Sequence, residues 1–178
     1  MSTYNFIISQ AKPDDIDTLR QMSIDTFTDT YAEFNTKEDM QLHLSREFNR
    51  KHLLDELLDI QNFYFIASVD NEAAGYIKLR TAKQPETLQD KSNIELERIY
   101  VLKKYQGSGL GKLLIEQCIK IATEKGYNVL WLGVWKQNEK AIMFYKKCGF
   151  SIFGEQVFTL GSDPQSDWLM MKELKDQY

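Results

Sequence analysis

Apolar and polar residues follow one another along the chain in two alternating patterns. Short runs in which apolar residues are continuous or occupy every second position are typical of strands, and they cover residues 4–9, 63–69, 74–80, 95–102, 129–135, 150–160 and 167–172. Stretches with apolar residues three or four positions apart predict amphipathic helices at about 13–27, within 36–58, at 110–125 and at 138–148. This order predicts a mixed α/β fold, and we expect residues 1–178 to form a single domain.

Local signals predict where several of these helices begin and end. Thr36 and Asp39 have the spacing of a capping box, and Asn138 can cap the helix that follows it. Gly126 and Gly149 each follow the last residues of a helical stretch, where a glycine commonly ends the helix. The run 129–135 is apolar at nearly every position, which predicts a central strand that is covered on both faces.

The composition limits what the chain can bind. Lys and Arg number 22 and Asp and Glu number 26, a net charge of −4, which disfavours nucleic acid and agrees better with a cationic partner. No apolar stretch approaches the roughly 20 residues that span a bilayer, and the first residues do not resemble a signal peptide. We therefore expect a cytoplasmic protein with no membrane partner. The cysteines (Cys118 and Cys148) and histidines (His43 and His52) lack metal-ligand spacing, so we expect no metal.

The segment from Gln106 to Lys112, with the sequence QGSGLGK, is the most informative part of the chain. It joins a predicted strand to a predicted helix, so its backbone N–H groups at the helix N-terminus suit a pyrophosphate. A plain strand-to-helix turn is the alternative interpretation. The spacing is not that of a P-loop, because Leu113 stands where that motif needs Ser or Thr, nor that of the G-x-G-x-x-G motif of dinucleotide-binding domains.

Two motifs resemble the GCN5-related N-acetyltransferases. Gln106-x-x-Gly109-x-Gly111 is similar to the Gln/Arg-x-x-Gly-x-Gly/Ala signature of that family, and residues 138–150 are similar to its following motif, which runs Asn-x-x-Ala-x-x-Phe-Tyr-x-x-x-Gly-Phe. Residues 24–30, 97–100 and 131–135 extend the resemblance to the bacterial PaiA-type spermidine/spermine acetyltransferases. The resemblance implies a mixed, mostly antiparallel sheet flanked by helices, with two central strands that splay apart.

The resemblance also implies where acetyl-CoA, the co-substrate of the family, binds. The residues it assigns to this role are Ile99, Tyr100, Val101, Gln106, Gly107, Ser108, Gly109, Leu110, Gly111, Lys112, Asn138, Ala141, Tyr145 and Lys147. Strand backbone at 99–101 would hold the pantetheine arm, and the amides of 106–112 would hold the pyrophosphate. Asn138 as a helix cap alone, and Lys147 as a solvated side chain, are the simpler alternatives.

Two residues match the catalytic positions of the family. Tyr145 is where relatives carry the proton donor for the departing thiolate, and a phenol is a workable donor to a thiol of lower pKa. Glu97 is where relatives carry the group that deprotonates the amine, often through water. Glu95 lies on the same strand face at a period of two, so we expect it to contact the substrate and to be able to share this task. A core tyrosine and a half-exposed strand carboxylate are the alternatives. The implied reaction is direct attack of a neutral amine on the thioester, without a metal or a covalent enzyme intermediate.

The acceptor is the least constrained part of the prediction. Asp25, Asp29 and Glu33 recur every four residues, which on one helix face suits the spaced ammonium groups of a polyamine, although a solvated acidic face also explains them. We expect a polyamine acceptor and a monomer or homodimer. A protein α-amine or lysine, another small amine, and a non-catalytic acetyl-CoA-binding regulator remain alternatives.

Overall fold

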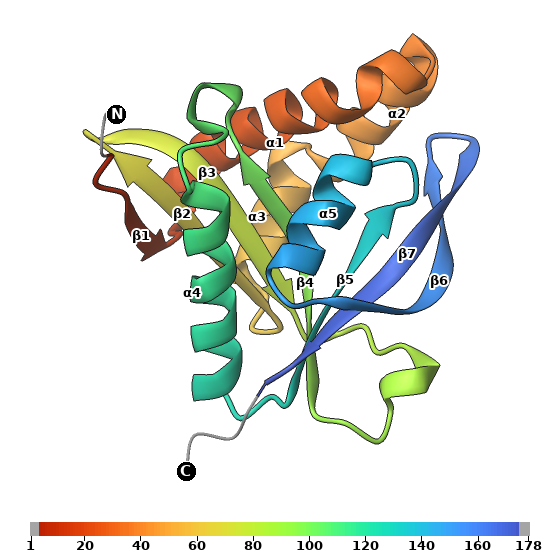
Figure 1. The fold of residues 1–178 in the computed structure, drawn as a ribbon. Helices are drawn as coiled ribbons and strands as arrows, with labels where there is room; N and C mark the ends of the chain where they lie inside the picture. The colour runs from red at the N-terminus through yellow and green to blue at the C-terminus, as the bar shows by residue number, and fades with distance from the viewer. Residues whose placement is uncertain (1–3, 175–178) are drawn as a thin grey trace.

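A seven-stranded sheet with helices on both faces forms the protein in the computed structural model, which describes residues 4–174 (Figure 1). The strands are β1 (Ile7–Gln10), β2 (Asn62–Val69), β3 (Glu72–Arg80), β4 (Asn93–Val101), β5 (Val129–Trp135), β6 (Ser151–Leu160) and β7 (Asp163–Glu173). The helices are α1 (Ile16–Tyr31), α2 (Lys37–Glu47), α3 (Arg50–Leu58), α4 (Leu110–Glu124) and α5 (Glu139–Lys147). Short 3₁₀ turns lie at Pro13–Asp15, Ala32–Phe34, Glu86–Leu88 and Lys103–Tyr105.

The sheet is mixed and mostly antiparallel, as predicted. Its order is β1-β2-β3-β4-β5-β7-β6, and only the β4–β5 pair is parallel. That pair is short, because Asn93–Glu95 lie opposite Val129–Trp131 and the register then ends. Beyond this point β4 and β5 diverge, which Figure 1 shows as a widening gap between the two strands. The splay expected between two central strands is therefore present.

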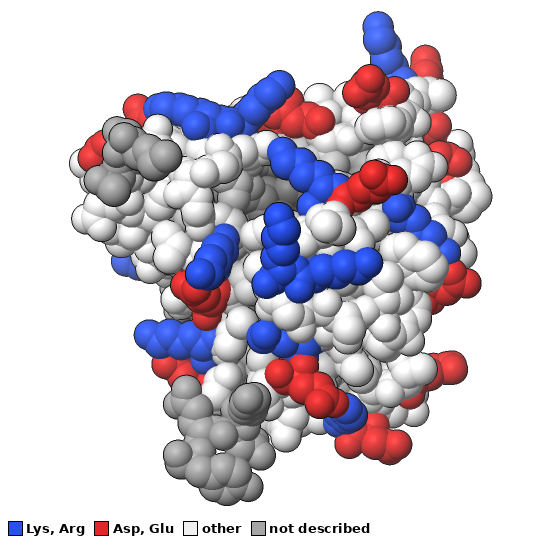
Figure 2. Space-filling view, viewed as in Figure 1, with Lys and Arg blue, Asp and Glu red and all other residues white. Residues whose placement is uncertain are grey.

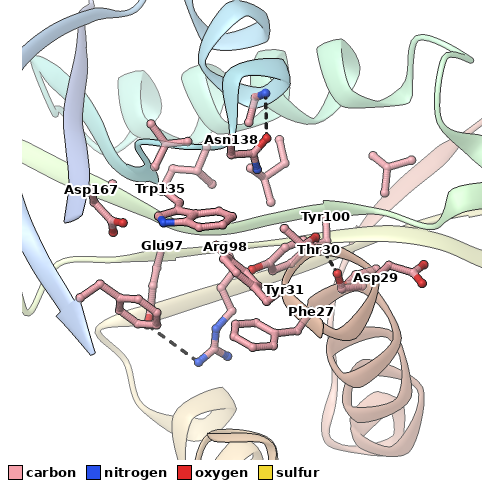
Figure 3. Close-up of a pocket in the computed structure, with 18 of the residues that line it drawn as sticks. Phe27, Asp29, Thr30, Tyr31, Glu97, Arg98, Tyr100, Trp135, Asn138 and Asp167 are labelled. Carbon is pink, nitrogen blue, oxygen red and sulfur yellow. Dashed lines mark hydrogen bonds and ion pairs between the residues drawn. The ribbon is translucent and has the colours of Figure 1, made fainter. Parts of the chain in front are cut away.

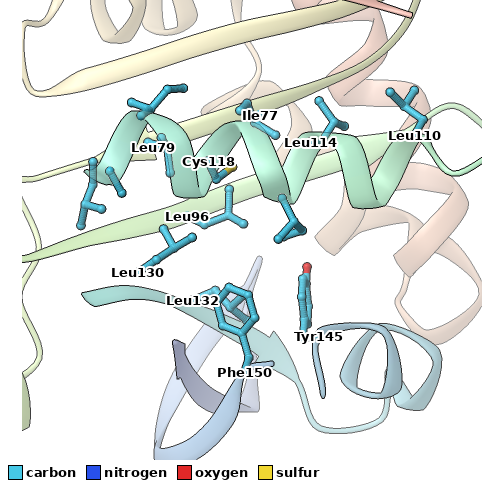
Figure 4. Packing of buried hydrophobic residues seen from close by; sticks show 14 of the residues in the cluster. Ile77, Leu79, Leu96, Leu110, Leu114, Cys118, Leu130, Leu132, Tyr145 and Phe150 are labelled. Carbon is cyan, nitrogen blue, oxygen red and sulfur yellow. The ribbon is translucent and has the colours of Figure 1, made fainter. Parts of the chain in front are cut away.

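Two apolar layers hold the helices onto the sheet. Leu110, Leu114 and Cys118 of α4 pack on one face, beside Tyr145 and Phe150 (Figure 4). The opposite face is covered by α1 and α3, which carry Leu19, Met22 and Leu53 into smaller clusters. Strand β5 is buried on both faces: Leu130 and Leu132 join the α4 layer, and Val129 and Trp131 form a separate cluster with Leu88 and Leu169. All four of these β5 residues are buried, which confirms the prediction of a central strand covered on both faces.

Most predicted helix ends are confirmed. The side chains of Thr36 and Asn138 accept backbone N–H groups of Asp39 and Ala141, and Gly126 and Gly149 adopt positive φ after α4 and α5. The predicted strand 167–172 is too short, because β7 begins at Asp163, which pairs with Leu160 across a two-residue turn. The first predicted strand begins later than expected, at Ile7, and α1 continues to Tyr31 rather than ending near Phe27.

One irregularity in the sheet was not predicted. The β3–β4 register shifts so that Lys78 pairs with Arg98 while Leu79 pairs with Leu96, which leaves Glu97 as the extra residue of a β-bulge. The bulge lies where β4 leaves β5, so it sets the direction of the strand along the gap. Within residues 4–174, no helix is long and apolar enough to cross a membrane.

Candidate functional site

The gap between β4 and β5 opens into a large cleft of about 1390 Å³. Residues from α1, β4, β5, the loop before α4, the start of α5 and the β6–β7 hairpin line it (Figure 3). A cavity of this size exceeds that of most single small-molecule sites and has room for an extended ligand together with a second, smaller one. The splayed strands therefore create the space in which two substrates can meet.

The glycine segment forms one end of this cleft. Gly107 and Gly109 have φ values of +80° and +90°, so the chain turns sharply just before α4 begins at Leu110. Within the described part of the chain, no acceptor is recorded for the N–H groups of Gly107 and Gly109. The first N–H groups of α4 also lack intrahelical partners by geometry, and the positive end of the helix dipole lies here. This end of the cleft is therefore built to bind an anion.

Basic side chains surround the same end. Figure 2 shows Lys and Arg side chains gathered on the face formed by α4 and α5, around a hollow between them. Lys103, Lys112 and Lys140 line the cleft. Lys103 and Lys140 carry no recorded ion pair within residues 4–174, and Lys112 has one exposed partner, Glu116, at 3.8 Å. The positive charge at this end is therefore available to a ligand carrying phosphates.

Strand β4 supplies the wall between the two ends. Ile99, Tyr100 and Val101 line the cleft, and the parallel register with β5 has already ended at Glu95. The backbone groups of β4 that face β5 thus have no strand partner along this stretch. Such an edge can pair with an extended chain of amide groups. Opposite it, Asn138 and Ala141 line the cleft at the start of α5, where the Asn138 side chain accepts the Ala141 N–H at 3.1 Å.

Tyr145 lies at the border between the cleft and the apolar layer. The residue is 9% exposed, lines the cleft, and its ring packs beside Phe144 and Phe150. Its hydroxyl has no recorded hydrogen bond within residues 4–174. Burial raises the pKa of Tyr145 well above its ordinary value, so the phenol stays protonated at neutral pH. Its protonated hydroxyl is therefore able to donate a hydrogen bond or a proton to a ligand in the cleft.

Glu97, the bulged residue of β4, lies in a buried network of charges. Arg80 Nη1 donates to Glu97 Oε1 at 2.9 Å, and Arg80 Nε donates to Glu95, so one guanidinium joins both predicted carboxylates. Lys78, which is 1% exposed, forms ion pairs with Glu97 and with Glu56 of α3. The network holds the side chain of the bulged residue in one position, because each buried charge has a partner of opposite sign.

The same network sets the charge state of the two glutamates. Burial alone would raise the pKa of Glu97, but Arg98, Lys78 and Arg80 outweigh it and hold that pKa below its ordinary value. Burial dominates at Glu95, whose pKa is raised despite the hydrogen bond from Arg80. Glu97 is therefore ionised at neutral pH and is a weak base by itself. It is suited to receive a proton through water rather than to hold one.

Carboxylates and aromatic rings line the other end of the cleft. Asp29 of α1 and Asp167 of β7 both line the cleft, and Figure 3 shows them on opposite sides of the Tyr31 and Trp135 rings. The centres of the Tyr31 and Trp135 rings lie 5.7 Å apart. Neither aspartate has a recorded ion pair with any residue from 4 to 174. This end therefore offers negative charge and ring faces, the chemistry that binds ammonium groups.

The acetyltransferase (GNAT) family model matches residues 19–150, about three quarters of the chain. The chain belongs to the GNAT family of acetyltransferases. It is 39% identical to an uncharacterized N-acetyltransferase, named for the pepI 3′ region, of Lactobacillus delbrueckii subsp. lactis over 167 residues, which cover 94% of this chain and 96% of that one. It is 26% identical to the spermidine N(1)-acetyltransferase of Thermoplasma acidophilum over 143 residues, which cover 78% and 84% of the two chains.

A solved GNAT structure has the same fold. The PaiA N-acetyltransferase of Thermoplasma acidophilum in complex with coenzyme A superposes with a TM-score of 0.78 at 25% identity, covering 95% of this chain and 99% of that one. The predicted resemblance to the GNAT family and its PaiA-like members is thereby confirmed. The α/β fold with a mixed sheet flanked by helices is confirmed with it.

The GNAT cleft brings together most of the residues that the sequence singled out. Ser108, Leu110 and Lys147 do not line it: the Ser108 hydroxyl donates to the Tyr105 carbonyl, Leu110 is fully buried, and Lys147 is exposed in the last turn of α5. Of the acidic triplet, Asp29 lines the cleft and Asp25 and Glu33 do not.

Sequence reasoning missed Asp167, Trp135, Lys103 and Lys140 as residues that line the cleft. Asp167 stands at the first position of the predicted final strand, and no local signal marks it. Lys103 lies shortly before the first recognised motif, and Lys140 lies at one of the variable positions of the second. Their nearness to those motifs is the signal that could have found them.

Proposed function

We propose that this GNAT protein transfers the acetyl group of acetyl-CoA to a primary amine of a polyamine such as spermidine or spermine. The observation that carries the proposal is the polarity of the cleft. One end offers backbone N–H groups and lysines, whereas Asp29 and Asp167 line the part of the cleft beyond it and have no ion pair within residues 4–174. A phosphate-bearing donor and a cationic acceptor would thus enter from chemically opposite ends.

The residues present fit acetyl-CoA. The N–H groups of the 106–112 segment and the side chain of Lys112 suit the pyrophosphate, and the unpaired edge of β4 at 99–101 suits the amides of the pantetheine arm. The thioester supplies an activated acetyl group that an amine can attack directly. The fold supports the same assignment, because the PaiA structure that superposes on this chain was solved with coenzyme A.

Glu97 and Tyr145 have the properties that proton transfer in this reaction needs. A primary amine with a pKa of about 10 enters as an ammonium and must lose a proton before it can attack. The ionised Glu97 carboxylate lowers the cost of that loss by accepting the proton through water. Tyr145, kept protonated by burial, donates a proton to the departing sulfur. Both residues line the same cleft.

The acceptor class is supported by charge and by one relative. Asp29 and Asp167 favour a cation over a neutral or anionic acceptor, and the rings of Tyr31 and Trp135 favour an alkylammonium. The relative from Thermoplasma acidophilum that is named as a spermidine N(1)-acetyltransferase is 26% identical to this chain over 143 residues, which cover 78% of it. A peptide α-amine carries one positive charge, and it uses this end of the cleft less fully than a polyamine does.

An amine panel tests the proposal. Release of the CoA thiol from acetyl-CoA would be followed with spermidine, spermine, putrescine, butylamine, a peptide with a free N-terminus and a lysine peptide, with mass analysis of each product. We expect the highest kcat/KM with the polyamines. A higher kcat/KM with either peptide would refute the polyamine acceptor. Tight acetyl-CoA binding with no turnover of any amine would refute catalysis and favour a regulator.

A further inference from the structure

Asp167 is a buried carboxylate that lines the cleft without forming an ion pair within residues 4–174. It is 8% exposed. On β7 it lies opposite Trp135 of β5 on one side and opposite Gln156 of β6 on the other. Buried carboxylates are normally paired with a cation. Glu95 and Glu97 follow that rule through Arg80, whereas Asp167 has no recorded ion pair with any residue between 4 and 174. The charge of Lys83 lowers the pKa of Asp167 from nearby, but no direct ion pair from within the described residues neutralises the carboxylate.

The surroundings hold the Asp167 carboxylate in place without neutralising it. Lys83 Nζ donates to Gln156 Oε1 at 2.9 Å, so the amide nitrogen of Gln156 is turned toward Asp167, to which it donates. Gly133 of β5 lies against both side chains: a Cβ built there would lie 2.7 Å from Gln156 Nε2 and 3.4 Å from Asp167 Oδ2. Glycine inside a central strand weakens it, and here its missing side chain makes room for this pair.

Aromatic rings complete the environment on the cleft side. Figure 3 shows the Trp135 indole between Asp167 and Tyr31. Phe34 packs against the same indole, with ring centres 5.0 Å apart. Burial and the charge of Asp167 raise the pKa of Tyr31 to about 12, so its phenol stays neutral. Burial also raises the pKa of Asp167 itself, against the opposing effects of the Gln156 hydrogen bond and the charge of Lys83. A carboxylate flanked by ring faces is the arrangement that binds an alkylammonium.

We propose that Asp167, together with Trp135 and Tyr31, binds an ammonium group of the acceptor other than the one that reacts, and so selects diamines and polyamines over monoamines. The inference rests on the proposed function. The reacting nitrogen has to lose its proton, and a carboxylate that stabilises its charged form would oppose that loss. A second ammonium keeps its charge throughout the reaction. Asp167 is therefore a specificity residue and not the base.

The variant Asp167→Asn tests this assignment, because its amide oxygen can still accept the Gln156 N–H while the negative charge is lost. We expect the KM for putrescine and spermidine to rise about 10- to 100-fold, the loss of one charge-assisted contact in a buried site. The kcat for these amines, and both constants for butylamine, should stay within about twofold. Asp163→Asn, an exposed aspartate of the same strand outside the cleft, is the matched control and should change neither constant.

Other outcomes overturn the inference in distinguishable ways. An equal rise of KM for putrescine and butylamine means that Asp167 binds the reacting nitrogen, and a fall of kcat with both amines means that it acts in the chemistry. Unchanged constants refute any role. If Asp167→Asn does not fold, Asp167→Glu keeps the charge and should retain the preference for putrescine over butylamine, so its loss refutes the inference. A wild-type enzyme that acetylates peptides but no polyamine instead refutes the proposed function.

Discussion

Gly109 gives the sharpest test of the anion-binding end of the cleft. It precedes the first residue of α4 with φ +90°, and a Cβ built on it meets no atom within 4 Å. Space therefore does not limit substitution there, and only two effects remain. One is the backbone strain of a side chain at positive φ, and the other is any charge placed beside the N–H groups of the segment.

The two effects have different sizes. Holding a non-glycine residue at such a φ costs about 1–2 kcal/mol of folding stability. A carboxylate about 5 Å from one phosphate charge is repelled by about 0.8 kcal/mol in bulk water and about 3.3 kcal/mol at an effective dielectric constant of 20. Gly109→Asp should therefore weaken CoA binding by about 4- to 300-fold beyond any effect of strain. Gly109→Ala carries the strain alone.

The opposite end of α4 supplies the matched control. Gly126 has φ +78°, a Cβ built there also meets nothing within 4 Å, and the residue does not line the cleft. Calorimetry should show weaker CoA binding for Gly109→Asp and unchanged binding for Gly126→Asp, while urea unfolding shows similar losses of stability in both. The difference in CoA affinity should shrink as salt is added. Equal CoA affinities for the two folded variants would refute the pyrophosphate assignment.

Three further predictions concern protons and buried charge. Tyr145→Phe should lower kcat about 10- to 1000-fold with CoA affinity nearly unchanged. The wild-type enzyme should show no loss of activity from ionisation of this phenol below pH 10. A variant that loses CoA binding but keeps its kcat would contradict the role of Tyr145 as proton donor. Glu97→Gln should slow turnover with a deficit that shrinks toward the amine pKa, so a deficit independent of pH would contradict the proton-accepting role. Glu56→Gln should cost about 3–5 kcal/mol in urea unfolding, against less than about 1 kcal/mol for the exposed neighbour Asp55→Asn, and equal losses would contradict the buried network.

The network also predicts the acid stability of the fold. Burial opposes ionisation of Glu56, but Arg98 and Lys78 outweigh it and lower its pKa to about 2 from an ordinary 4.5. A carboxylate whose pKa is lower in the folded state than in the unfolded state stabilises the fold at pH values above the unfolded-state pKa. This stabilisation is lost as the pH falls through the folded-state pKa. A shift of this size corresponds to about 3 kcal/mol, lost between about pH 4.5 and pH 2. The Glu56→Gln variant should lack this part of the acid transition.

Features that depend on neighbouring residues were predictable from the sequence. The caps at Thr36 and Asn138 and the helix-ending glycines require only residues within one turn, and each has the expected geometry. The glycine segment was predicted for the same reason, since its turn and the α4 N-terminus are adjacent in the chain. The continuous apolar run of β5 likewise indicated burial on both faces without any knowledge of its partners.

Features that depend on strand pairing were not predictable. The bulge at Glu97 exists because β3 and β4 differ in register on either side of it, and neither strand carries a glycine or proline there to mark it. Asp167 faces the cleft because β7 inserts between β5 and β6, an order that the sequence of elements along the chain does not reveal. The acidic triplet illustrates the same point, because α1 ends at Tyr31 and Glu33 lies in the 3₁₀ turn that follows.

Net charge was a weak guide to the acceptor for a related physical reason. The chain carries 26 acidic residues, yet their effect on a ligand depends on which of them the fold has already neutralised. Cationic side chains of β3 and β4 form ion pairs with Glu56, Glu95 and Glu97, so the protein itself neutralises these three carboxylates. Asp29 and Asp167 line the cleft and have no ion pair with any residue from 4 to 174. An incoming cation is therefore attracted more strongly to these two aspartates than to the three glutamates that the fold has already neutralised.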